Sequence, residues 1–233
     1  MSKILILFLK TPRPGLVKTR LTSIFSQSEA AELYSSFIKD TLHLALNITG
    51  VSVYVAWTPD DGLPELQSVL GCNAKVSWFK QKGNHLGEKL SNALKGFLEK
   101  KTQKIVILGG DSPLLPQNYV EQAFSALDKN EIVFGPAIDG GYYLIGMSSK
   151  AIDKYKTVFE LIDWGTSRVL DQTRKAIRSC SLSYHELPTW YDVDYPEDLE
   201  KIRNDIKLLR KDGDYKTGSN TEATIKAIFE RRS

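Results

Sequence analysis

The chain has 233 residues, of which 42% are hydrophobic and 25% are charged, and its formal net charge is +3. These values fit a single large α/β domain and exclude disordered, collagen-like and coiled-coil proteins. No apolar run approaches the roughly 20 residues that cross a bilayer, and the charge is too small to indicate nucleic acid by itself, so we expect neither a membrane span nor a nucleic-acid partner.

In the first half of the chain, the apolar pattern predicts strands that alternate with helices. A helix is expected to begin near Ser26, because Ser26 and Glu29 have the spacing of a capping box and apolar residues then recur at helical intervals as far as Leu42. A short helix is expected over residues 63–70. The expected strands cover residues 4–9, 51–57 and 75–79.

The second half repeats this rhythm and adds one further strand. Helical periodicity is present over residues 86–98, 120–127 and 169–177, and Pro196 opens a helix whose apolar face runs to Leu209. The expected strands cover residues 105–108, 132–134, 142–147 and about 182–187, and for 142–147 an antiparallel direction is open. We predict one α/β domain over residues 1–210 with a mostly parallel sheet flanked by helices, to which residues 211–233 add a loop and a helix.

A basic loop follows the first strand. Residues 1–28 contain no acid before Glu29, and the loop is shaped by two prolines and Gly15. It lacks the P-loop and dinucleotide-fold glycine patterns, yet Arg forks and Lys point charges suit phosphates. A solvated basic loop is the alternative, but the fixed shape favours phosphate binding. The candidate residues for binding the nucleotide phosphates are Lys10, Arg13, Gly15, Lys18 and Arg20, together with Gly109 and Gly110 of a later turn. Lys18 is also a candidate for stabilising the leaving phosphate.

Acidic residues occur where later strands end, and in open α/β sheets ligands collect at such ends. Asp111 follows the strand 105–108 behind Gly109 and Gly110, and a carboxylate among small residues suits Mg²⁺ or Mn²⁺ on phosphate oxygens. A simple turn is the alternative. Asp192 and Asp194 alternate as on a strand and so share one face. Either could be a second metal ligand, or Asp194 could only cap the helix opened by Pro196.

A third cluster, Asp139-Gly140-Gly141-Tyr142, follows the strand 132–134. It could be only a hairpin turn, but two glycines beside tyrosines favour close approach of a ligand to the backbone. Asp139 is therefore the candidate general base, and Gly140, Gly141 and Tyr142 are candidates for acceptor binding. Trp164 and Thr166 join this acceptor set because an indole can stack on a base or sugar, although tryptophan is more often core.

Six segments occur in an order that resembles a known family: KTPRPGLVKTRL, GNHLGEKL, GGDSPLL, GPAIDGGYYLIG, DWGTSRVL and YDVDYPEDL. Together, over about residues 3–205, they resemble bacterial glycosyltransferase-A-like proteins of the nucleotide-diphospho-sugar transferase superfamily. More distantly, the chain is similar to the nucleotidyltransferases that make molybdenum-cofactor dinucleotides and to 2-phospholactate guanylyltransferase.

The resemblance implies a glycosyltransferase-A-like fold, with a nucleotide on the N-terminal half of the sheet and a divalent metal bridging protein to diphosphate. Asp111 matches the metal-binding aspartate and Asp194 the second aspartate, and the four cations of residues 10–20 match the basic phosphate loop. Two positions depart from the pattern. Tyr195 stands where relatives usually have Thr, and Gly110 replaces the usual Ser.

The predicted function is a metal-dependent transferase that uses Mg²⁺ or Mn²⁺, a nucleotide-activated donor and a small-molecule acceptor. Glycosyl transfer from a nucleotide-diphospho-sugar is placed first. The alternative is nucleotidyl transfer with release of pyrophosphate from a nucleoside triphosphate, since both reactions need the same residues, and a non-catalytic nucleotide-binding protein is the third reading. Cys72 and Cys180 match no zinc spacing, and a reduced cytoplasm is the expected location.

Overall fold

The first strand, β1 (Lys3–Lys10), is apolar on both faces and lies in the middle of the sheet. Its alternate side chains enter two separate cores, because successive residues of a strand point to opposite faces. Leu5 and Leu7 belong to one core, and Ile4 and Ile6 belong to the other. The computed structural model describes residues 2–72, 75–98, 104–151 and 153–232.

Within the described residues, the strands form one seven-stranded sheet. They are β1, β2 (Ser52–Thr58), β3 (Val76–Lys80), β4 (Lys104–Gly109), β5 (Ile132–Pro136), β6 (Tyr142–Ser148) and β7 (Tyr184–Glu186). Their order is β3-β2-β1-β4-β6-β5-β7, and β6 alone runs antiparallel, to both β4 and β5. The mostly parallel sheet predicted from the sequence is therefore confirmed, and the open direction of the strand near residues 142–147 is antiparallel.

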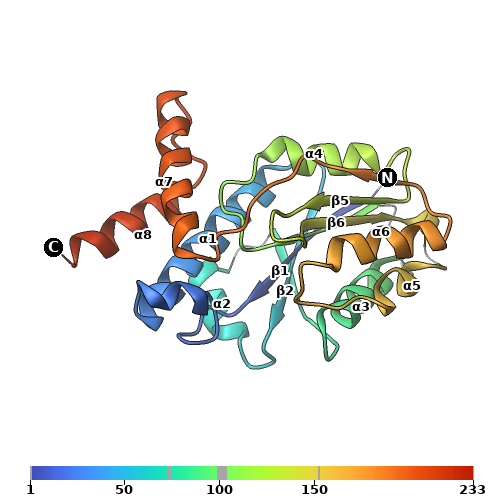
Figure 1. Ribbon diagram of the computed structural model, residues 1–233, viewed down its shortest axis with the longest axis horizontal. Helices are drawn as coiled ribbons and strands as arrows, with labels where there is room; N and C mark the ends of the chain where they lie inside the picture. The colour runs from blue at the N-terminus through green and yellow to red at the C-terminus, as the bar shows by residue number, and fades with distance from the viewer. Residues whose placement is uncertain (1, 73–74, 99–103, 152, 233) are drawn as a thin grey trace.

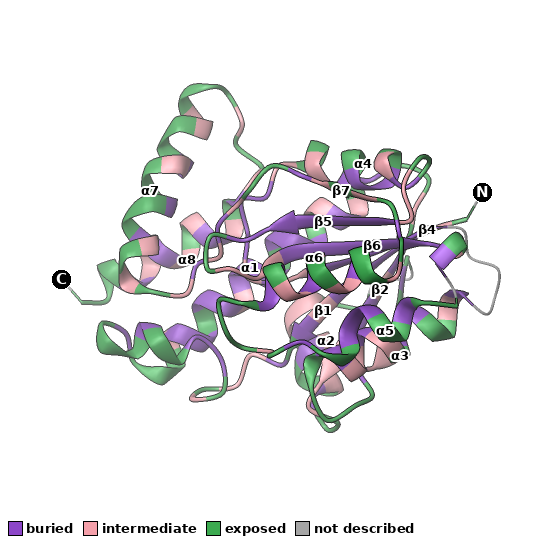
Figure 2. Cartoon of the chain, turned by 45° about the vertical axis from the view of Figure 1, so that its right-hand side comes forward, coloured by how far each residue is buried: buried purple, intermediate pink, exposed green. Residues whose placement is uncertain are grey.

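Helices cover both faces of this sheet (Figure 1). One face carries α1 (Gln27–Asn47), α2 (Leu63–Leu70) and α4 (Gln117–Ala126), and the same core includes residues of α7 (Pro196–Lys211) and α8 (Ser219–Glu230), of which α8 packs on α1. The other face carries α3 (Leu86–Leu98), α5 (Tyr155–Glu160) and α6 (Val169–Ser179). The central strands are buried, whereas the edge strands β3 and β7 are partly exposed, and helices turn one side inward and the other to solvent (Figure 2). Buried strands between two helical layers explain why β1 and β4 have continuous apolar sequences.

Helix α1 begins at the predicted capping box. Ser26 Oγ accepts a hydrogen bond from the Glu29 N–H at 3.2 Å, and Glu29 Oε2 accepts one from the Ser26 N–H at 2.7 Å. Hydrogen bonds from Arg232, and then from Ser26, lower the pKa of Glu29 to about 2. Because Arg232 follows α8, this contact joins the end of the chain to the start of α1.

The buried carboxylate of Asp40 ties α8 to α1. Asp40 Oδ1 accepts hydrogen bonds from the backbone N–H and the side-chain amide of Asn220, at 3.1 and 2.8 Å. Asp40 Oδ2 accepts from the backbone N–H and the hydroxyl of Thr221, at 2.9 and 2.6 Å. These are free N–H groups of the first turn of α8, so a side chain from α1 caps α8. The predicted boundary near residue 210 stays a prediction.

Several short elements lay outside the sequence expectations. The periodicity did not predict α5, which has six residues, nor the 3₁₀ helices η1 (Thr19–Ser23) and η2 (Ser149–Ala151). The strand expected over about 182–187 shortens to β7, and residues 192–194 form no strand, contrary to the alternation of Asp192 and Asp194. Among the described helices, none combines the length and the apolar character needed to cross a membrane.

Candidate functional site

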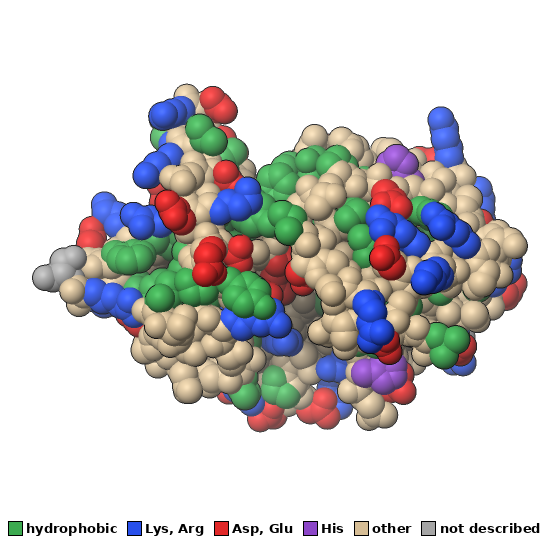
Figure 3. Space-filling view, in the orientation of Figure 1, with side chains coloured by type: hydrophobic (Ala, Val, Ile, Leu, Met, Phe, Trp, Pro, Cys, Tyr) green, Lys and Arg blue, Asp and Glu red, His purple; other side chains and the backbone are tan. Residues whose placement is uncertain are grey.

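The carboxyl ends of four neighbouring strands meet at one edge of the sheet. In the strand register, Lys10 at the end of β1 lies beside Thr58 at the end of β2. Gln81 directly follows β3, and Asp111 follows β4 by two residues. A cavity of about 680 Å³ lies above these strand ends and is lined by all four side chains. In the space-filling view, acidic and basic side chains meet in a hollow near the middle of the molecule (Figure 3).

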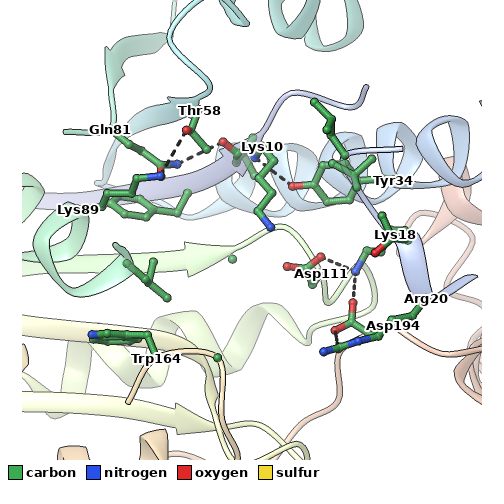
Figure 4. Close-up of a pocket in the computed structure, with 18 of the residues that line it drawn as sticks. Lys10, Lys18, Arg20, Tyr34, Thr58, Gln81, Lys89, Asp111, Trp164 and Asp194 are labelled. Atoms are coloured by element: carbon green, nitrogen blue, oxygen red, sulfur yellow. Dashed lines mark hydrogen bonds and ion pairs between the residues drawn. The ribbon is translucent and has the colours of Figure 1, made fainter. Parts of the chain in front are cut away.

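Lys18 lies at the centre of the charged end of this cavity (Figure 4). Its side chain is 2% exposed, and its ammonium pairs with the carboxylates of both Asp111 and Asp194, the latter at 2.8 Å. The rings of Tyr34 and Phe37 lie 5.7 and 5.4 Å from Nζ. Burial lowers the pKa of Lys18, but the charges of Asp111 and Asp194 outweigh burial, so the net pKa is raised and the side chain stays protonated.

Asp194 is held by two cations. Besides Lys18, it accepts a hydrogen bond from Arg20 at 3.3 Å. Burial raises the pKa of Asp194, but the charges of Lys18 and Arg20 more than offset it, so the pKa lies below its usual value. The alternative that Asp194 caps the helix opened by Pro196 is wrong. Tyr195 is the N-cap of α7, and the backbone N–H of Asp194 donates to Asp198 at 2.9 Å.

Asp192 lies beside the pair but does not line the cavity. Its Oδ1 accepts a hydrogen bond from the Ser112 hydroxyl. Burial, and then the charge of Asp111, raise the pKa of Asp192 to about 7. Asp194, in contrast, lines the cavity and shares the Lys18 ammonium with Asp111. Of the two aspartates that the sequence left open, Asp194 is therefore the better placed.

The predicted basic loop divides into two parts. The cavity is lined by Lys10, Lys18 and Arg20. Arg13 does not line it, because its guanidinium bonds Glu65 at 2.7 Å and Asp61 at 3.0 Å on and before α2. Gly15 also lies off the lining, in a turn with φ of +77° that favours glycine.

The two glycines before Asp111 have different surroundings. Gly109 lines the cavity, whereas Gly110 does not. A Cβ on Gly110 would lie 2.8 Å from Leu9 Cδ2 and 3.0 Å from Ile38 Cγ2. Gly110 therefore lets the turn after β4 pack against the core, which is a structural reason for glycine there.

The residues predicted to bind the acceptor substrate, or to act on it as a base, also fall into two groups. Tyr142 and Trp164 line the cavity, whereas Asp139, Gly140, Gly141 and Thr166 do not. Asp139 accepts a hydrogen bond from the Gly141 N–H at 2.9 Å, as in a turn. A Cβ on Gly140 would lie 2.2 Å from the Ser167 carbonyl oxygen, so this glycine is needed for packing. The charge of Asp139 still contributes to the raised pKa of Asp192, so Asp139 lies close enough to Asp192 to interact with it electrostatically.

The lining residues that the sequence analysis missed include Tyr34, Thr58, Gln81 and Lys89. The rule that ligands collect where parallel strands end could have found Thr58 and Gln81, because both lie where a predicted strand ends. Tyr34 is a buried residue of α1, and its hydroxyl accepts a hydrogen bond from the Lys10 backbone N–H at 3.2 Å. The positions of Tyr34 and Lys89 depend on how their helices pack on the sheet, which a single sequence does not show.

The carboxylates at this site suit a divalent cation such as Mg²⁺ that takes only part of its coordination sphere from the protein. Across the described parts of the chain, no three His, Cys, Asp or Glu side chains come together as a metal-binding group. Asp111 and Asp194 do converge on one point, because both contact Lys18 Nζ. Mg²⁺ is commonly held by one or two carboxylates together with water and substrate phosphates. The residues present therefore fit a metal that binds with a phosphorylated substrate.

Comparison with known proteins identifies the family. Residues 41–166 match the family described as "Uncharacterized protein conserved in bacteria (DUF2064)", and the chain belongs to this family. Over 191 residues it is also 26% identical to the 2-phospho-L-lactate guanylyltransferase of Methanocaldococcus vulcanius. This aligned region covers 80% of this chain and 78% of the relative.

Solved structures support the same assignment. A protein of Desulfovibrio desulfuricans G20 assigned as a nucleotide-diphospho-sugar transferase is 31% identical, with a TM-score of 0.83, covering 97% of this chain and 98% of that one. Two more distant structures share the fold. A CMP:2-keto-3-deoxy-manno-octonic acid synthetase complexed with CTP is 14% identical, with a TM-score of 0.57 and coverage of 89% and 99%. Rv0371c of Mycobacterium tuberculosis H37Rv, in complex with manganese, is 13% identical, with a TM-score of 0.53 and coverage of 87% and 98%. The chain is thus a transferase with the nucleotide-diphospho-sugar transferase fold.

Proposed function

We propose that the protein is a nucleotidyltransferase: an acceptor attacks the α-phosphate of a nucleoside triphosphate, and pyrophosphate leaves. The observation that carries this proposal is the buried Lys18 ammonium between Asp111 and Asp194, at the strand ends that line the cavity. Similarity to a guanylyltransferase over four-fifths of the chain supports it. Glycosyl transfer, the first expectation from the sequence, becomes the alternative.

The charge of the cavity favours a triphosphate over a nucleotide-diphospho-sugar. Among the described lining residues there are four cations, Lys10, Lys18, Arg20 and Lys89, and two carboxylates, so the lining carries a net charge of +2. A triphosphate has about four negative charges at neutral pH, and about two remain when one divalent cation is bound. A nucleotide-diphospho-sugar with the same cation is close to neutral. The triphosphate is therefore the better match to this lining.

In this proposal, Asp111 and Asp194 hold the divalent cation. When bound, Mg²⁺ or Mn²⁺ supplies Lewis-acid stabilisation of the phosphate oxygens. The two carboxylates suit this role because Lys18 and Arg20 keep Asp194 ionised. The manganese found in Rv0371c supports a metal site in this fold.

The cations have separate tasks in the same proposal. Lys18 is buried beside both carboxylates and near the rings of Tyr34 and Phe37, so its charge is held at the strand ends where the phosphates would lie. Lys10 forms no ion pair with the described residues, and its side chain reaches into the cavity beside Asp111 (Figure 4). Lys10 and Arg20 would neutralise the departing pyrophosphate. Asp139 remains the candidate base for the acceptor, and in this structure it lies outside the cavity lining.

The location of the protein belongs to the same proposal. Cys72 and Cys180 are both free thiols. Free thiols are usual in a reducing compartment. We therefore propose a cytoplasmic enzyme, where nucleoside triphosphates are available.

The test is pyrophosphate release from single nucleoside triphosphates. The purified protein is incubated with Mg²⁺ or Mn²⁺, each of the four common triphosphates and a panel of phosphorylated and hydroxylated small acceptors. We expect pyrophosphate from at least one triphosphate, with equimolar transfer of its nucleotidyl group to the acceptor. The Asp111→Asn variant should lower the rate by about 100-fold or more.

A parallel assay with nucleotide-diphospho-sugars separates the alternatives. Release of a nucleoside diphosphate with sugar transfer, and no pyrophosphate from any triphosphate, would establish glycosyl transfer instead. Binding of a triphosphate that is indifferent both to metal and to Asp111→Asn would contradict the proposed catalytic role and support a binding protein.

A further inference from the structure

Gln81 is a buried amide whose orientation is fixed by its neighbours. The residue is 8% exposed, and Nε2 donates to the backbone carbonyls of Leu9 at 3.2 Å and Ala56 at 2.8 Å. Both amide hydrogens are thus used on two carbonyl oxygens. A flipped amide would place its oxygen against those carbonyls, so only one orientation is compatible with the site.

The consequence is that Gln81 presents an acceptor to the cavity. Its Oε1 has no hydrogen-bond partner among the described residues, and Gln81 lines the cavity. The Gln81 backbone N–H also donates to Trp57 at 2.9 Å, so main chain and side chain are both held. Oε1 is not one of the buried unpaired polar atoms of the described residues, so it is open to the cavity, where a ligand with an N–H group could donate to it.

Lys89 places a donor beside this acceptor. Its Nζ lies 3.4 Å from Thr58 Oγ1, two residues along β2 from the Ala56 carbonyl that binds Gln81. Lys89, Thr58 and Gln81 lie together at one end of the cavity, away from Lys18 and Asp194 (Figure 4). The Thr58 contact is long and uses one hydrogen at most. The ammonium therefore has donors left for a ligand oxygen.

Apolar side chains line the same cavity near this end. Leu86 is 42% exposed there, and Trp164 lies on the opposite wall from Lys89 in the same view (Figure 4). An acceptor and a cationic donor side by side, with an indole and a leucine nearby, suit a flat heterocycle with a polar edge. The charged end around Lys18 and Lys10 is then left for phosphates.

From this arrangement we infer that Gln81 and Lys89 select a nucleobase that carries a ring N–H next to a carbonyl, as guanine, hypoxanthine and uracil do. Gln81 Oε1 accepts from the ring N–H, and Lys89 donates to the adjacent carbonyl oxygen. Adenine has an amine next to a ring nitrogen that carries no hydrogen. That ring nitrogen is a weaker hydrogen-bond acceptor for the Lys89 ammonium than a carbonyl oxygen is. This inference depends on the proposed function, because it places the base of the triphosphate substrate.

The test compares two purine triphosphates that differ only at this edge. Inosine triphosphate has N1–H and a C6 carbonyl, whereas ATP has N1 and a C6 amine. Dissociation constants are measured by isothermal titration calorimetry with Mg²⁺ and without acceptor. We expect inosine triphosphate to bind about tenfold or more tightly than ATP, the discrimination typical of a paired contact to a base edge.

Lys89→Met should bring the two dissociation constants to within about threefold of each other. The matched control is Lys82→Met, an exposed lysine outside the cavity with the same change of charge, which should keep the wild-type ratio. Lys89 is chosen because substitution of Gln81 would also break its bonds to β1 and β2. Equal binding of the two triphosphates by the wild type, or an unchanged ratio in Lys89→Met, overturns the inference and leaves the proposed function intact. Absence of binding by any nucleoside triphosphate contradicts the proposed function and this inference together.

Discussion

Lys18 combines an uncommon backbone with an uncommon environment. It is one of two non-glycine residues with positive φ in the described chain, at +48°, and its ammonium is almost fully buried. A left-handed backbone is unfavourable for a residue with a Cβ, and a buried ammonium is stable only when it is paired. Asp111 and Asp194 supply that pairing. The arrangement directs one charge at the strand ends, where a phosphate would lie.

The sequence placed Lys18 and Arg13 in the same phosphate-binding loop and did not show that, of these two, Lys18 alone would line the cavity. The structure separates them by their partners. Lys18 meets aspartates more than 90 residues away along the chain, and Arg13 meets Asp61 and Glu65 at the start of α2. Such distant pairing leaves no local signal in a sequence. The acidic partners Asp111 and Asp194 were predictable, because they follow a strand and precede a helix.

This difference predicts opposite results for two matched variants. Lys18→Met removes the charge from the centre of the site and should lower the rate of pyrophosphate release by about 100-fold or more. Arg13→Met removes a charge that is neutralised by exposed carboxylates, so we expect a rate within about threefold of wild type. Steady-state assays under the same conditions compare the two. Equal losses in both variants would show that Arg13 also acts on the phosphates, as the sequence alone suggested.

At the scale of elements, the chain end is fixed to the first helix. Helix α8 packs beside α1 in the structure, and its first turn is capped by Asp40. The sequence analysis predicted α1 from periodicity, the Ser26–Glu29 box from spacing, and a helix in the segment 211–233. It did not predict this cap, because Asp40 lies within the helical run of α1 and 180 residues before Asn220. Short elements such as α5 were missed because six residues are too few for a periodic pattern.

The cap predicts a specific loss of stability. In Asp40→Ala, the backbone N–H groups of Asn220 and Thr221 and the Thr221 hydroxyl lose their acceptor in a buried place. We expect the free energy of unfolding to fall by about 2–4 kcal/mol, from the lost cap and the unpaired donors. Urea denaturation measures this loss, and the control is Asp153→Ala, because Asp153 is exposed and makes no ion pair with the described residues. A loss below about 0.5 kcal/mol would contradict the role of Asp40.

At the scale of the whole molecule, the sheet brings distant segments of the chain to one edge. The strand order places β1 between β2 and β4, so that Lys10, Thr58 and Asp111 are neighbours. Strand alternation and the strand ends were predictable from composition and spacing, and this is why the acidic and basic groups could be expected in one cleft. The sequence did not predict which cations of the basic loop line the cavity, because this depends on how the loop 11–18 packs against α1 and α2.

The central claim is that Asp111, Asp194 and Lys18 together hold a metal-bound triphosphate at this edge. The most direct measurement is the anomalous diffraction of Mn²⁺ in crystals grown with a triphosphate that cannot be hydrolysed. We predict one manganese peak bonded to the carboxylates of Asp111 and Asp194, with phosphate density beside Lys18 and Lys10. Manganese and triphosphate bound elsewhere on the molecule, with the ion pairs of Lys18 unchanged, would contradict the account.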